Sequence, residues 1–152
     1  MLRLLATALL VLLVALPTRA QRLWPVSGTV TESYGMVVNG PGVASPNPGV
    51  FIASPAAVPV RAVVEGTVAK VDMMPEYGAY VLVRHGEILT AYANLSQVRV
   101  REGDAVRSGQ VLGDAGIPQT PKGEGLFFAV FRYDAHSARA VTLDPLAWLR
   151  GE

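Results

Sequence analysis

The sequence predicts an all-β fold that ends in one short helical turn near the C-terminus. Two observations lead to this fold class. Short apolar and β-branched runs recur between residues 29 and 133, and turn signals rich in glycine separate them at short intervals. No long segment after residue 20 spaces its apolar residues three and four apart, as an amphipathic helix requires. A chain of 152 residues fits one domain.

The first 20 residues are predicted to be a secretory signal peptide rather than part of the fold. Arg3 gives a positive start, an apolar run of 13 residues follows from Leu4 to Leu16, and small Ala20 precedes polar residues. A bilayer span needs about 20 apolar residues, so an uncleaved anchor is the alternative. We expect cleavage after Ala20, export to the periplasm and no membrane span in the mature chain.

Charge and cysteine content exclude several classes of function. The chain has 13 basic and 12 acidic residues, and removing Arg3 and Arg19 with the signal segment leaves 11 basic residues in 132. Such a balance argues against a nucleic-acid partner, which would require a basic stripe. The absence of cysteine excludes disulfides and thiolate metal sites.

The first half of the mature region predicts three strands and one long loop. Residues 29–33 alternate as a strand does, while residues 39–49 are rich in Gly, Pro, Ser and Asn and predict a long loop. Long loops in compact domains are usually functional or mobile. The apolar runs 58–64 and 67–71 predict two strands joined by a turn at 65–66.

The second half predicts four longer strands and also further short strands, which the turn signals at 102–104 and 108–110 separate. The strand predicted at 79–83 is continuously apolar, which indicates that both of its faces are covered. In the strand predicted at 98–101, Val98 and Val100 alternate with two arginines, which indicates that one face is exposed to solvent. Residues 73–78 predict a loop, and His85 with Gly86 predicts a hairpin turn. The four predicted strands are residues 79–83, 88–92, 98–101 and 126–133.

The C-terminal segment 144–149 predicts a short helix. Asp144 is the expected N-cap, and Pro145 would be the first helical residue, where the missing N–H costs least. We expect Trp148 to anchor this helix to the core rather than to contact a ligand.

These motifs, in this order, resemble the lysostaphin-type (LytM-like) murein endopeptidases. The resemblance implies an antiparallel β domain of the duplicated-hybrid or barrel-sandwich kind over residues 21–152. The segments that carry it are 27–35, 49–53, 58–62, 65–68, 77–78, 81–86, 92–95, 100–113 and 144–149.

The resemblance also implies a zinc site, and this chain departs from it at every position. The family uses a His and an Asp four residues apart, a His in a Tyr-x-His-Leu motif, and a His-x-His pair on the last strand. These positions fall on Asn47, Phe51, Asn94, Gly125 and Phe127. A catalytic zinc needs three N, O or S ligands and a water, so we expect no metal, no cofactor and no catalytic residue.

The remaining histidines do not suggest another metal site. His85 is interpreted as a polar turn residue, and His136 with Asp134 as part of an exposed loop between small residues. The sequence offers no third ligand beside either histidine.

The degenerate positions are expected to line a groove between segments 46–51 and 125–129. Residues 125, 127, 129, 131 and 133 share one face of the last strand, and their side chains make that face apolar. Positions 51 and 127 bind the same metal in the family that the chain resembles, so the resemblance implies that Phe51 touches Phe127 and that the two rings form an apolar floor. These rings could equally be simple core. The expected neighbours of this groove are Tyr34, His85, Tyr92, Ala129 and Phe131.

Three functions remain open. The first is a non-catalytic adaptor in peptidoglycan remodelling or cell division, similar to the EnvC- and NlpD-like amidase activators, with a periplasmic amidase or another envelope protein as partner. The second is a direct peptidoglycan-binding module, and the third is an active hydrolase with an unrecognised site. The hairpin at 100–110 also resembles biotin- and lipoyl-carrier domains, but no lysine lies beside Met73 and Met74, and Lys70 falls within a strand.

Overall fold

The computed structural model describes residues 22–152, apart from the side chains at 36–40 and 43–44. The predicted signal segment therefore lies outside the described residues. The described chain forms β1 (Thr29–Glu32), β2 (Gly35–Gly40), β3 (Val43–Asn47), β4 (Gly49–Ala53), β5 (Pro59–Arg61), β6 (Gly66–Met74), β7 (Gly78–His85), β8 (Ile88–Val98), β9 (Ala105–Val106), β10 (Val111–Ala115), β11 (Leu126–Asp134), β12 (Arg139–Leu143) and α1 (Pro145–Arg150). The all-β class is confirmed.

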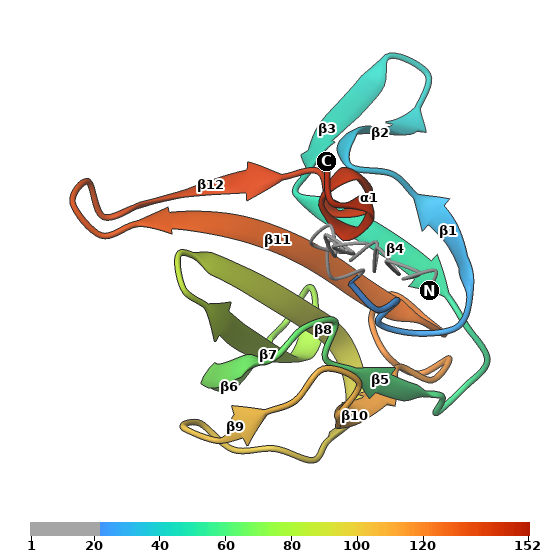
Figure 1. The fold of residues 1–152 in the computed structure, drawn as a ribbon. Coiled ribbons are helices and arrows are strands. Elements are labelled where there is room, and N and C mark those ends of the chain that lie inside the picture. Colours follow the sequence, from blue (N-terminus) through green and yellow to red (C-terminus); the bar gives the residue numbers. More distant parts are fainter. Residues whose placement is uncertain (1–21) are drawn as a thin grey trace, which may run out of the picture.

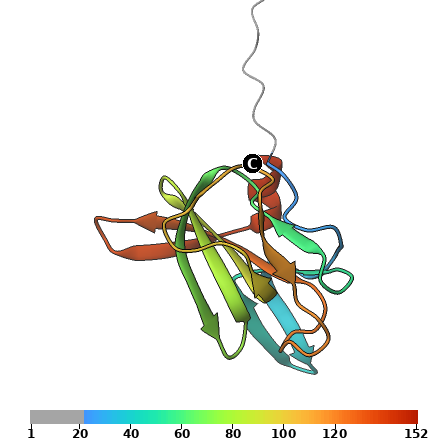
Figure 2. The same cartoon turned by 90° about the horizontal axis from the view of Figure 1, so that it is seen from below.

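One antiparallel sheet dominates the molecule (Figure 1). Its strands follow the order β1-β4-β11-β8-β7-β6-β9, with β12 paired to β11 and β10 paired to both β5 and β8. Strands β2 and β3 form a separate hairpin, and the β11–β12 hairpin projects from the body in both views (Figures 1 and 2). Neighbouring strands in the central part of the sheet thus come from distant parts of the sequence.

The central strands bury different side chains on their two faces, because side chains alternate along a strand. On β11, Leu126, Phe128 and Val130 enter the main core together with Tyr92 of β8. The intervening Phe127 and Ala129 belong to a second, smaller cluster that also contains Phe51, Ala91 and Ala93. This second face carries the candidate site.

The predicted loop at 39–49 is wrong, because most of that segment is paired. Only Pro41 and Gly42 form a turn, in which the φ of Gly42, 73°, is left-handed. Pro46 lies opposite Met36 within a two-stranded hairpin. A proline is tolerated there because one side of each strand has no neighbour to which an N–H could donate.

Several other strand limits also differ from those predicted. β6 continues to Met74, so the predicted 73–78 loop shortens to residues 75–77, and of 58–64 only Pro59–Arg61 is a strand. β8 ends at Val98, although Val100 is buried between two exposed arginines as the alternation indicated. Tyr80 and Leu82 are only half-buried, so the strand predicted at 79–83 is not covered on both faces.

The predicted C-terminal helix is confirmed. Asp144 caps α1, since its carboxylate accepts hydrogen bonds from the backbone N–H groups of Leu146 and Ala147, and Pro145 begins the helix. Trp148 is 8% exposed and packs in the main core, with the Arg22 guanidinium 3.9 Å from its ring centroid. Within residues 22–152 no helix has the length and apolar character to cross a bilayer.

A chain of hydrogen bonds ties the β7–β8 turn to the main core. His85 Nδ1 donates to the Glu65 carbonyl, and His85 Nε2 lies 2.8 Å from Thr90 Oγ1, which lies 3.2 Å from the Tyr92 hydroxyl. That hydroxyl accepts the Val63 N–H at 3.0 Å. Burial raises the pKa of Tyr92 to about 12 and lowers the pKa of His85 below its ordinary 6.5. His85 is thus a structural residue of this turn, as interpreted from the sequence.

This arrangement predicts a loss of stability in mild acid. Because the pKa of His85 is lower in the folded chain than in the unfolded chain, the unfolded chain binds more protons as the pH falls below 6.5. The free energy of unfolding should therefore decrease between roughly pH 7 and pH 5. In His85→Gln that decrease should be smaller, whereas His136→Gln, which changes an exposed histidine, should keep it. Urea unfolding at several pH values measures this, and equal slopes in wild type and His85→Gln would contradict it.

A candidate binding groove

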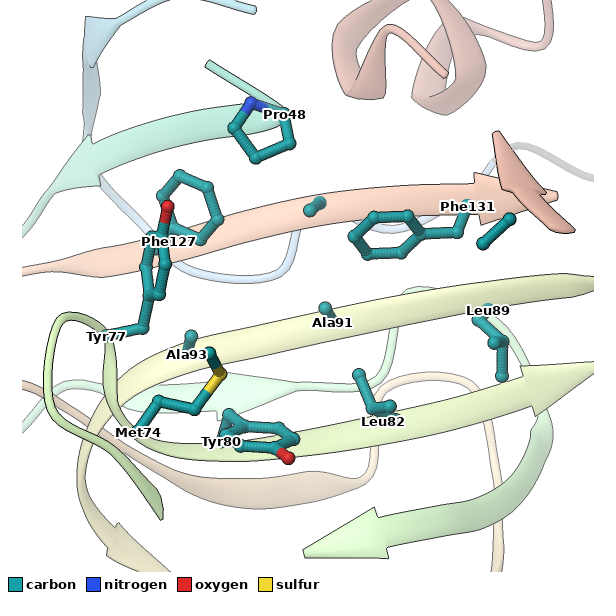
Figure 3. Close-up of a pocket in the computed structure, with 12 residues that line it drawn as sticks. Pro48, Met74, Tyr77, Tyr80, Leu82, Leu89, Ala91, Ala93, Phe127 and Phe131 are labelled. Atoms are coloured by element: carbon teal, nitrogen blue, oxygen red, sulfur yellow. The ribbon is translucent and has the colours of Figure 1, made fainter. Parts of the chain in front are cut away.

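An apolar groove of about 380 Å³ lies over the second face of the sheet (Figure 3). The strands β8 and β11 form its floor, β7 forms one wall, and Pro48 overhangs the other side (Figure 3). None of the lining side chains is charged, and the hydroxyl groups of Tyr77 and Tyr80 are their only polar atoms. The lining residues are Pro48, Met74, Tyr77, Tyr80, Leu82, Leu89, Ala91, Ala93, Phe127, Ala129, Phe131 and Ala140.

The predicted proximity of Phe51 and Phe127 is confirmed. The two residues are directly opposite each other in the antiparallel pairing of β4 with β11, and both are buried in the second cluster. The ring that packs on Phe127 comes from Tyr77, with centroids 4.8 Å apart and planes tilted by 42°. Both descriptions offered by the sequence therefore hold for Phe127, which is buried and also lines the groove.

Gly125 has no room for a side chain, because the Ile52 carbonyl oxygen and the Phe51 ring occupy the space where one would lie. A Cβ added at Gly125 would lie 2.4 Å from the Ile52 carbonyl oxygen and 2.9 Å from two atoms of the Phe51 ring. Its φ of 141° is also a conformation that L side chains rarely adopt. A metal-binding side chain could not be added at 125 without displacing Phe51.

Asn47 has a structural role at the start of β4. Its amide nitrogen donates to the Ser33 carbonyl at 2.8 Å, and its amide oxygen accepts the Gly49 N–H at 3.2 Å. The side chain is buried and fixes the junction between β3 and β4. It does not line the groove.

Asn94 holds the loop that precedes β11. It adopts the left-handed conformation, with φ of 66°, which asparagine tolerates better than most residues. Its amide nitrogen donates to the carbonyl groups of Gly123 and Gly125 at 2.9 and 3.0 Å. Its buried amide oxygen has no hydrogen-bond partner. The residue at this position thus fixes a loop rather than facing a ligand in the groove.

Of the five expected groove neighbours, Ala129 and Phe131 line the groove and three others do not. The predicted positions of Tyr92 and His85 are wrong, because side chains alternate between the two faces of a strand. Tyr92 enters the main core, whereas its neighbours Ala91 and Ala93 belong to the second cluster. His85 is hydrogen-bonded to Thr90 on the main-core side. Tyr34 is also misplaced, because its hydroxyl lies 3.0 Å from Thr142 Oγ1, beside the main core.

Sequence reasoning missed Lys122 and Tyr77. The Lys122 ammonium lies 5.6 to 6.0 Å from the ring centroids of Phe127, Tyr77 and Phe51, and 3.4 Å from the Glu32 carboxylate. A positive charge therefore lies beside the two phenylalanines that replace expected metal ligands. The Pro, Lys and Gly residues before the last strand do indicate a loop that contains a lysine. Nothing in this sequence pattern shows that the loop places the lysine beside the groove.

The donor set does not fit a catalytic zinc. Phe51, Phe127 and Gly125 offer no side-chain ligand, and the amides of Asn47 and Asn94 are engaged with the backbone through at least one atom each. In the part of the chain from residue 22 onward, no three His, Cys, Asp or Glu side chains group closely enough to hold a metal. The chemistry that these residues support is the binding of apolar groups.

A family model described as "Peptidase family M23" matches residues 45–140, which include all the groove strands from β4 to β11. The cell division protein DipM of Caulobacter vibrioides is 34% identical over 95 residues, covering 61% of this chain and 15% of that protein. A lipoprotein NlpD/LppB homologue of Pseudomonas aeruginosa is 32% identical over 128 residues, covering 83% of this chain and 39% of that protein.

A chain from the structure of the SpoIIQ-SpoIIIAH pore forming complex has a similar fold, with a TM-score of 0.67 and 24% identity. The match covers 83% of this chain and 89% of that one. The chain spans less than half the length of each curated relative that it matches.

The Phe51–Gly125 contact predicts that these two loop glycines differ in their tolerance of a side chain. Gly125→Ala should lower the free energy of unfolding by about 2–4 kcal/mol, because the new methyl meets the Ile52 carbonyl and the ring and the backbone is strained. Gly123→Ala is the matched control. Its φ of 80° is also left-handed but nothing lies within 4 Å, so about 1 kcal/mol is expected. Equal losses in urea unfolding would show that the Ile52 carbonyl and the Phe51 ring do not restrict position 125.

Proposed function

Because the chain belongs to peptidase family M23, we propose that it is a non-catalytic member, acting in peptidoglycan remodelling or cell division by binding a partner in its apolar groove. The observation that carries the proposal is the identity of the residues at the positions where the family binds its metal. The strands that frame the groove are kept, while aromatic rings and a glycine stand where the family resemblance expects metal ligands.

Loss of catalysis follows from these residues rather than from the fold. Zinc hydrolases activate water on a metal held by three protein ligands. Phe51 and Phe127 fill this position with carbon, and restoring a ligand at Gly125 requires the Phe51 ring to move. Asn94 is already needed to hold the loop before β11.

The proposed partner is a periplasmic cell-wall amidase or another envelope protein. Support comes from the names of two relatives, one a cell division protein and the other a lipoprotein NlpD/LppB homologue. A neighbour with the same fold comes from a complex of two proteins, SpoIIQ and SpoIIIAH. The groove offers a partner apolar surface with half-buried side chains on β7, β8 and β11, including Leu82, Leu89 and Phe131. Export to the periplasm is part of the proposal.

Direct binding to peptidoglycan is the second candidate. Tyr77 and Tyr80 place half-buried aromatic rings with hydroxyl groups at one end of the groove (Figure 3). Such rings can pack against a sugar or a stem peptide while their hydroxyl groups form hydrogen bonds. Co-sedimentation with purified sacculi, in the absence of any other protein, separates this candidate from the first.

Substitutions in the groove should abolish partner binding without unfolding the domain. Leu82→Glu and Phe131→Glu each place a charge on the apolar surface and should weaken binding at least tenfold, since one buried apolar side chain contributes about 1.5–3 kcal/mol. Phe127 is less suitable, because it is 4% exposed and a charge there would threaten folding. Val141→Glu is the control, since Val141 is 59% exposed and does not line the groove.

The measurement is a titration of the purified protein into periplasmic cell-wall amidases, following both complex formation and the rate of peptidoglycan cleavage. Wild type and Val141→Glu should bind and change the rate, and the two groove variants should not. If wild type leaves the rate of every amidase unchanged and forms no complex, the adaptor function is wrong.

A further inference from the structure

We propose that Lys122 makes the Phe127 end of the groove a carboxylate-binding position. The ligand is a segment of a protein partner in which apolar side chains lie next to an Asp, a Glu or a C-terminal carboxylate. This inference rests on the proposed function and specifies the chemistry of the partner.

Lys122 is the charged side chain that the structure places against the groove's aromatic end. Its Nζ lies 5.6 Å from the centroid of Phe127 and 5.7 Å from that of Tyr77, and both of these rings line the groove. At about 6 Å a ring face still attracts an ammonium group. The cation is therefore held at the end of a surface whose lining carries no charge of its own.

The loop holds the lysine in this place. Asn94 binds the carbonyl groups of Gly123 and Gly125, on either side of residue 124, and the Thr120 hydroxyl donates to the Gly123 carbonyl at 2.7 Å. Backbone bonds between Gly116 and Gly125 close the loop at its base. These bonds fix the backbone next to Lys122, while the Glu32 carboxylate and the three rings are the groups that surround its ammonium.

Glu32 shows which group the site accepts. Its carboxylate lies 3.4 Å from Lys122 Nζ, and the two side chains are 38% and 27% exposed. A partly exposed ion pair of this kind is weak, so a second carboxylate can replace Glu32 at little cost. An incoming ligand gains more than Glu32 does, since it also buries apolar groups on the neighbouring rings.

The lining favours a protein segment over glycan. Sugar hydroxyls and amides lose hydrogen bonds with water when they enter a groove. This groove can replace few of those hydrogen bonds, because the hydroxyl groups of Tyr77 and Tyr80 are the only polar groups of its lining side chains. Leucine-, phenylalanine- or methionine-like side chains lose nothing of this kind. A carboxylate next to such side chains would meet Lys122 while the side chains cover the floor at Ala91 and Ala129.

Two simple probes with opposite head groups test the proposal. Decanoate and decylammonium share an alkyl chain, and each is titrated into the purified protein by calorimetry, with amide NMR shifts locating the site. Decanoate should bind in the groove, with shifts at Ala91, Ala129 and Lys122, and about fivefold more tightly than decylammonium. The preference should shrink as salt is added.

Three variants isolate the role of the charge. Lys122→Gln should bring the two affinities to within about twofold, whereas Glu32→Gln should tighten decanoate binding by removing the competing carboxylate. Lys70→Gln is the matched control, because Lys70 is an exposed lysine paired with Asp72 and lies outside the groove lining. The inference is overturned by equal affinities in wild type, by tighter binding of decylammonium, by an unchanged ratio in Lys122→Gln, or by no groove binding of either probe.

A purified muropeptide with free stem-peptide carboxylates distinguishes the source of the carboxylate. Binding that depends on Lys122 and matches that of decanoate would assign the ligand to the cell wall and contradict a protein segment. This test is separable from that of the adaptor function. Capture of an amidase that survives Lys122→Gln would overturn the carboxylate position alone, and loss of all amidase capture in wild type would overturn the adaptor.

Discussion

The packing of Phe51 across Gly125 is the contact on which the rest of the site depends. The antiparallel register sets Phe51 opposite Phe127, and Phe127 opposite Ala93, so residues distant in sequence meet on one face of the sheet. The absent side chain at Gly125 lets the ring of Phe51 lie against the backbone. Phe51 does not itself line the groove, but it is buried beside Phe127, which lines one end, and neither residue offers a side-chain metal ligand there.

Asn47 and Asn94, at two further positions where the resemblance implies metal ligands, have structural roles. The side chain of Asn47 connects the start of β4 to the segment between β1 and β2, since it donates to the Ser33 carbonyl and accepts the Gly49 N–H. Asn94 fixes the loop before β11. That loop carries Lys122, whose charge faces Phe51, Tyr77 and Phe127. In the proposed function, an amino acid side chain that can pair with anions but cannot activate water takes the place of the family's bound cation.

The sequence predicts the fold class and the helix, because alternation and capping are local signals. The proximity of Phe51 and Phe127, which pair across β4 and β11, was expected only from the family resemblance, since no local signal gives a long-range pairing. The sequence misplaces Tyr92, since the face that a residue occupies depends on strand register, and a shift of one residue reverses it. It predicts a loop for 39–49 because prolines at the unpaired edge of a hairpin are indistinguishable in sequence from prolines that break a strand. Lys122 could not be found, since its position depends on the hydrogen bonds of Asn94, 28 positions earlier in the printed chain.

The claim that this domain binds but does not cleave is tested most directly by measuring zinc and hydrolysis on the same sample. The purified protein is dialysed against zinc, its metal content is determined by mass spectrometry, and it is then incubated with purified murein. We expect far less than one zinc per chain and no release of soluble peptides. One zinc per chain, together with cleavage of murein that a chelator abolishes, would contradict the claim.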